Sequence, residues 1–149
     1  MQKKVITNNA SQTQKLGEKL AKDILRRSIG QNATVLGLQG DLGGGKTTFL
    51  QGFAKGLNIK EKILSPTFVL IKRFKIKNKY FKNFYHIDCY RIKNIKDIEQ
   101  LDFKNIILNP ENIVAIEWPE RIKNILPKST IIIKFDFIDK NKREIVISF

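Results

Sequence analysis

The sequence predicts an α/β fold, and the order of its apolar segments indicates it. A short apolar run at 34–39 precedes a glycine-rich loop, and apolar residues at helical spacing follow that loop to about residue 57. Two later stretches, 69–88 and 130–149, each contain paired apolar runs around a polar turn, which is typical of a β-hairpin. No repeat or low-complexity linker divides the chain. We therefore expect one domain over residues 1–149.

Composition limits the class of protein. The hydrophobic content of 42% is ordinary for a globular protein. No apolar run approaches the roughly 20 residues needed to span a membrane, and no apolar signal segment follows the first basic residues. Cys89 is the only cysteine, which excludes an intrachain disulfide and a cysteine-rich metal site. We expect a cytoplasmic protein with no membrane contact and no disulfide-linked partner.

The formal charge of +14 has two interpretations. It is either an electrostatic footprint for nucleic acid or a compositional drift toward lysine, isoleucine and asparagine. The lysines are scattered over the whole chain rather than gathered in one stripe, which favours the compositional interpretation.

The N-terminal part predicts a strand followed by a helix. Residues 3–6 fit a short strand. Ser11 is the expected N-cap, with Gln14 three residues later to complete a capping box. Apolar residues between 16 and 25 share one face and predict a helix of roughly 12–16 residues, with its end marked by 30–32.

The next element contains residues 40–48, GDLGGGKTT, which match the phosphate-loop pattern G-x-x-x-x-G-K-[ST] in full. Glycines let the backbone point several N–H groups into one concavity, and the helix that follows adds its positive N-terminal end. Lys46 can reach the β- and γ-phosphates of a nucleotide, and the Thr47 hydroxyl can ligate Mg²⁺. The alternative is a glycine-rich turn that binds nothing. Successive glycines cost backbone entropy on folding, and a plain turn would not need them, so they favour the phosphate loop. The residues expected to bind the nucleotide are Asp41, Leu42, Gly43, Gly44, Gly45, Lys46, Thr47 and Thr48.

Residues 63–88 predict a bend and then the first hairpin. Pro66 pushes Ser65 toward extended geometry. Thr67 either senses the γ-phosphate through Mg²⁺ or only satisfies the bend. The hairpin strands are expected at 69–76 and 81–88, on either side of a polar turn.

Two strand ends carry acids. Asp88 follows the run 84–87 and Glu117 follows 113–116, so each is in the Walker B position, where a carboxylate emerges beside the phosphate loop. Each could instead be a surface acid at a strand end. Nothing in the residues decides which of the two orients the attacking water.

Two further polar residues lie near the first of these strand ends. His86, the only histidine, is either catalytic or a core imidazole, and it cannot build a zinc site by itself. Arg91 either stabilises charge on the γ-phosphate or pairs with a nearby acid.

The remaining elements are two short helices, at 94–101 and 101–108, and three strands. The strand at 112–117 is broken by Trp118 and Pro119, and the strands at 130–138 and 144–149 form the second hairpin. Guanine recognition usually needs an N-K-x-D motif. The nearest strings are 78–81, which lacks the acid, and 141–144, which lies in the predicted terminal hairpin, so adenine is the better candidate.

Several motifs in this order resemble the TsaE family, the small P-loop ATPases of bacterial tRNA threonylcarbamoyladenosine (t⁶A) synthesis. The family pattern pairs a GDLGAGKTTF loop with SPTF, H-x-D-x-Y-R and E-W-P segments, found here at 40–49, 65–68, 86–91 and 117–119. The one departure in the loop is Gly44, where alanine is usual. The resemblance covers nearly the whole chain. It implies a variant P-loop NTPase domain whose mixed sheet has central parallel strands, antiparallel hairpins at the sides and helices on both faces.

The resemblance also implies roles for residues. Lys46 would bind phosphate, Thr47 and Glu117 would hold Mg²⁺, Asp88 would be the Walker B-like acid, and 8–10 would border the adenine. The residues implied for a switch or for partner contacts are Ser65, Thr67, His86, Arg91 and Trp118.

The same family resemblance implies partners and an activity. The protein would be a weak, partner-stimulated, Mg²⁺-dependent ATPase that acts with the TsaB–TsaD complex on t⁶A37. It would contact tRNA indirectly, as a nucleotide-driven switch rather than as the transferase. The alternatives are a P-loop small-molecule kinase, although no obvious lid exists beyond 94–108, and a basic RNA-binding module that uses ATP incidentally.

Overall fold

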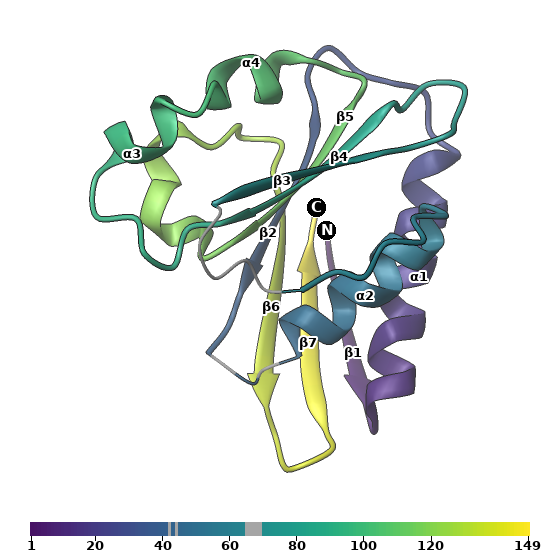
Figure 1. Cartoon of the computed structure of the whole chain (residues 1–149). Coiled ribbons are helices and arrows are strands. Elements are labelled where there is room, and N and C mark those ends of the chain that lie inside the picture. The colour runs from purple at the N-terminus through teal and green to yellow at the C-terminus, as the bar shows by residue number, and fades with distance from the viewer. Residues whose placement is uncertain (42, 44, 65–69) are drawn as a thin grey trace.

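The computed structural model describes residues 1–41, 43, 45–64 and 70–149. Within this part of the chain, seven strands form one mixed sheet in the order β1-β7-β6-β2-β5-β4-β3 (Figure 1). The predicted α/β class is therefore confirmed. The elements in chain order are β1 (Gln2–Thr7), α1 (Ala10–Leu25), β2 (Thr34–Gln39), α2 (Lys46–Gly56), β3 (Ile71–Lys75), β4 (Asn83–Asp88), α3 (Ile95–Glu99), α4 (Phe103–Leu108), β5 (Asn112–Glu117), the 3₁₀ helix η1 (Pro119–Ile125), β6 (Ile131–Phe137) and β7 (Arg143–Ser148).

The strand pairing has a parallel centre and antiparallel sides. Strand β2 pairs in parallel with β5 and β6, and β4 pairs in parallel with β5. The pairs β3–β4 and β6–β7 are antiparallel and correspond to the two predicted hairpins, and β1 adds to β7 at the edge. In the β4–β5 register Asp88 lies opposite Glu117, so the two acids reach the same edge of the sheet.

Helices α1 and α2 cover one face of the sheet (Figure 1). Their apolar residues pack on alternate residues of the strands. The Phe49 ring meets Phe135 of β6 edge-on, with centroids 5.4 Å apart, and Phe53 lies 5.6 Å from Phe84 of β4. This packing fixes α2, and therefore the loop that precedes it, against the central strands.

Helices α3, α4 and η1 cover the opposite face, where they bury the other alternate residues of β2, β4 and β5. Cys89 lies in this second core, and burial raises the pKa of its thiol to about 12. Among the described residues, no helix is long and apolar enough to cross a membrane.

Two boundaries differ from the sequence prediction. The N-cap of α1 is Asn9 and not Ser11, because Asn9 has an extended backbone and its side chain accepts a hydrogen bond from the Gln12 N–H at 2.9 Å. The Gln12 side chain in turn accepts from the Asn8 N–H, so a capping arrangement exists two residues earlier than expected. The helix also ends at Leu25, before the predicted end at 30–32. The predicted bend at 65–69 lies outside the described residues.

Candidate functional site

The loop between β2 and α2 follows a path that only glycine adopts readily. Gly43 and Gly45 have φ values of 80° and 100°. A Cβ atom on Gly40, whose φ is 149°, would lie 2.7 Å from the Phe135 carbonyl oxygen. Gly45 is the N-cap of α2 and supplies no side-chain cap, and the first turn contains no acid. The N-terminal N–H groups of α2 are thus suited to an anion.

Lys46, the first residue of α2, directs a buried ammonium group into this site. Its side chain is only 5% exposed, and its Nζ donates a hydrogen bond to the Gly40 carbonyl at 2.6 Å. The ammonium also lies 4.3 Å from the centroid of the Trp118 ring. Burial lowers the pKa of Lys46, while the charges of Glu117 and Asp88 oppose that shift. Among the described residues, no carboxylate lies within ion-pair distance of this ammonium.

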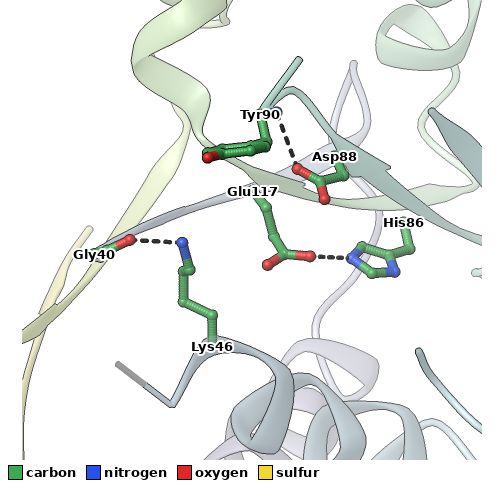
Figure 2. A network of polar contacts seen from close by, with 6 residues as sticks. All are labelled: Gly40, Lys46, His86, Asp88, Tyr90 and Glu117. Atoms are coloured by element: carbon green, nitrogen blue, oxygen red, sulfur yellow. Dashed lines mark hydrogen bonds and ion pairs between the residues drawn. The ribbon is translucent and has the colours of Figure 1, made fainter. Parts of the chain in front are cut away.

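The carboxyl ends of β4 and β5 bring two acids to the same site (Figure 2). Glu117 is 4% exposed, and its Oε2 accepts a hydrogen bond from His86 Nε2 at 2.7 Å. Asp88 is half-buried, and its Oδ1 accepts from the Tyr90 N–H at 3.0 Å. Burial raises the pKa of Asp88, and the nearby charge of Glu117 adds to that rise. The structure therefore places Asp88 and Glu117 beside the loop that carries Lys46, where the strand-end pattern put the two acids, and adds His86 as a partner of Glu117.

Trp118 is partly buried and lines this site next to Lys46. It has left-handed backbone angles, φ 58° and ψ 52°, at the junction between β5 and η1. The centroid of its ring lies 5.3 Å from that of Tyr90 and 4.3 Å from the Lys46 ammonium. The E-W-P segment thus supplies an acid to the site, Glu117, and an aromatic ring that contacts Lys46, Trp118.

The other predicted residues are distributed around the loop. Asp41 and Gly43 are exposed, and Gly45, Thr47 and Thr48 are partly buried at the start of α2. Four predicted residues lie outside the described part of the chain: Leu42, Gly44, Ser65 and Thr67. Of the remaining predicted residues, Arg91 is exposed in the turn after β4, and 8–10 form the junction of β1 with α1.

Sequence reasoning missed Arg143, the first residue of β7. Its Nη2 donates a hydrogen bond to the carbonyl of Gly43, within the glycine loop, at 3.1 Å. Its Nη1 donates to the Asp139 carbonyl, and its guanidinium lies 4.8 Å from the centroid of the Phe137 ring. The Arg143 Nε is the buried side-chain nitrogen without a hydrogen-bond partner among the described residues. Arg143 therefore ties the loop to the second hairpin.

The residues present fit a magnesium nucleotide better than an all-protein metal centre. No three His, Cys, Asp or Glu side chains of the described residues gather as a metal-binding group. Mg²⁺ needs only one or two protein oxygens when phosphate oxygens supply the others. Thr47 and Glu117 are the residues that could provide such oxygens, from the start of α2 and the end of β5.

Comparisons with known proteins agree on one family. The family model described as "Threonylcarbamoyl adenosine biosynthesis protein TsaE" matches residues 7–145. The tRNA threonylcarbamoyladenosine biosynthesis protein TsaE of Haemophilus influenzae is 35% identical over 127 residues, which are 84% of this chain and 76% of that protein. The protein of the same name from Aquifex aeolicus is 34% identical over 148 residues, covering 97% of this chain and 95% of that one.

A solved structure shares the fold. The crystal structure of YdiB from Bacillus subtilis matches with a TM-score of 0.70 and 28% sequence identity, and the match covers 99% of this chain and 84% of that chain.

Proposed function

Because this chain belongs to the TsaE family and so to threonylcarbamoyladenosine biosynthesis, we propose that it is a Mg²⁺-dependent ATPase of that process. It binds and hydrolyses ATP as an accessory protein in the formation of t⁶A37 in tRNA. It is a nucleotide-driven switch rather than the enzyme that transfers the threonylcarbamoyl group.

The observation that carries this proposal is the buried ammonium of Lys46. A cation removed from water is costly unless an anion accompanies it. Among the described residues none of the carboxylates pairs with Lys46, which lies at the positive end of α2 beside the glycine loop. A nucleotide polyphosphate supplies the negative charge that would pair with this ammonium at the N-terminus of α2.

The residues of the site divide the work between them. Residues 41–48 surround the phosphates with backbone N–H groups, and Lys46 donates to phosphate oxygens. Thr47 and Glu117 hold Mg²⁺, which neutralises phosphate charge when bound. Asp88, whose carboxyl is half-buried at the next strand end, is the second acid of the site. It orients either the metal shell or the attacking water.

The partner is the TsaB–TsaD complex, and tRNA is reached through that complex. The residues proposed for switch or partner contacts are Ser65, Thr67, His86, Arg91 and Trp118. Because these partners act on tRNA, we expect the protein to work in the cytoplasm.

The proposed function is tested by phosphate release from ATP, with and without the purified TsaB–TsaD complex. We expect slow release from the protein alone, a several-fold rise with the complex, and none when the metal is chelated. Failure of the protein to take up any adenine nucleotide at ample magnesium contradicts the proposal. A phosphorylated product in a metabolite screen would instead indicate the small-molecule kinase. A kinase would need a pocket for its acceptor beside the phosphates. The cavity of about 470 Å³ lined by α3 and α4 lies in the helical layer opposite to α2, so it does not support the kinase alternative.

Replacing Glu117 by alanine is expected to slow Mg²⁺-dependent hydrolysis at least about tenfold, or about 1.4 kcal/mol of barrier. The reason is that the variant loses the buried carboxylate at the end of β5. Glu111→Ala is the matched control, since this exposed acid lies just before the opposite end of β5. Titration of the rate with magnesium separates loss of metal affinity from loss of rate. An unchanged rate in Glu117→Ala would transfer the metal role to Asp88.

A further inference from the structure

The two most deeply buried charged side chains of the site, Lys46 and Glu117, have opposite signs but do not form an ion pair. Lys46 and Glu117 are 5% and 4% exposed, and their charges interact, yet no ion pair between them is present. Instead Lys46 donates to the Gly40 carbonyl and lies on the Trp118 ring, while Glu117 accepts from His86. In Figure 2 the Glu117 carboxylate lies between the side chains of Lys46 and His86 and turns Oε2 to the histidine.

A direct pair between Lys46 and Glu117 would disable the site before a nucleotide arrives. Opposite charges attract strongly where burial lowers the effective dielectric constant. Glutamate has three side-chain torsions and can swing toward a nearby ammonium unless something holds it. In such a pair, Lys46 would no longer be available to bind phosphate, and Glu117 would no longer be available to bind magnesium.

We propose that His86 is a positioning residue that holds Glu117 away from Lys46, so that both groups stay available to a magnesium nucleotide. This inference rests on the proposed nucleotide site and adds a residue whose task is to keep its charges apart. Its chemical role is to donate one hydrogen bond to the carboxylate, without touching the phosphates.

The position of His86 suits this role. It lies on β4, between β3 and β5, and pairs with Ala115 in the parallel register, two residues before Glu117. The side chain is 2% exposed, so packing fixes the imidazole ring. A carboxylate only accepts hydrogen bonds, so His86 Nε2 is the donor. A neutral imidazole can make this bond and leave the negative charge of Glu117 intact, which an arginine would neutralise.

The first test is a crystal structure of nucleotide-free His86→Met, which keeps the volume of the side chain but cannot donate. We expect the released Glu117 carboxylate to swing to within about 4 Å of Lys46 Nζ, the ion-pair distance. If the Glu117 carboxylate stays beyond that distance from Lys46, the proposal is wrong. This readout needs no nucleotide, so it decides the role of His86 even if the unaltered protein binds no ATP and the proposed function falls.

The second test measures ADP affinity in a chelator, where no metal ion links Glu117 to the phosphates and Lys46 still contributes to binding. His86→Met is expected to bind ADP about tenfold more weakly, because Glu117 now competes for Lys46. His86→Gln, which keeps a donor near the position of Nε2, is expected to bind like the unaltered protein.

The double variant His86→Met, Glu117→Gln distinguishes positioning from a loss of fold. Removing the charge of residue 117 removes the competitor, so ADP affinity should return to within about twofold of Glu117→Gln alone. If the double variant binds as weakly as His86→Met, His86 acts only through packing and the proposal is overturned. Where thermal unfolding shows that His86→Met does not fold, His86→Asn replaces it, because its shorter amide falls short of Glu117.

Discussion

Replacing Lys46 by alanine is expected to abolish measurable ATP hydrolysis, a loss of at least about a hundredfold or about 2.7 kcal/mol of barrier. The variant loses the buried ammonium that the site directs at its anion, and the phosphate charge that develops in the reaction is then unopposed on that side. The fold should persist, because among the described residues the Lys46 side chain makes one hydrogen bond, to the Gly40 carbonyl, and packs on one ring. Phosphate release and calorimetric ATP affinity are the measurements.

Lys55→Ala is the matched control for this experiment. Lys55 is an exposed lysine near the end of the same helix, so its loss removes an equal charge without touching the loop. We expect its activity to equal that of the unaltered protein. Hydrolysis that survives in Lys46→Ala would mean that the glycine loop has been assigned to the wrong function.

The sequence predicted the elements whose signals are local. The glycine pattern, the apolar strands before Asp88 and Glu117, and the two hairpins each depend on residues close together in the chain, and the structure has all of them. The predicted N-cap was wrong for a physical reason. Asn9 and Ser11 are both able to cap, but Ser11 lies inside α1, whereas Asn9 has the extended backbone of an N-cap.

The contacts that complete the site depend on how strands distant in the chain pair, and a parallel pair has no tight turn in the sequence to indicate it. Arg143 reaches Gly43 from 100 positions away, because β7 pairs with β6 and β6 with β2. His86 meets Glu117 because β4 and β5 pair in parallel with Ala115 opposite the histidine. Trp118 faces Lys46 because its backbone is left-handed, a conformation that the Trp-Pro sequence did not reveal.

Gly52→Ala in α2 is expected to destabilise the protein by about 3 kcal/mol, at the upper end of overpacking costs. The added Cβ would lie 1.9 Å from the Gln14 carbonyl oxygen and 2.6 Å from the Gln14 Cα atom. Both atoms belong to the α1 backbone and cannot rotate away, so the helices must separate. Gly17 and Gly56 make comparable close approaches along the same pair of helices.

The sign of this effect is informative, because helix propensity alone predicts the opposite. In an isolated helix alanine is more stable than glycine by about 1 kcal/mol. A fall in Tm of about 10 °C in thermal unfolding would therefore show that close approach of α1 and α2 outweighs propensity. Gly30→Ala is the control, since nothing lies within 4 Å of its Cβ position, and its Tm should change little. A Gly52→Ala protein as stable as the unaltered one would contradict the close packing behind the glycine loop.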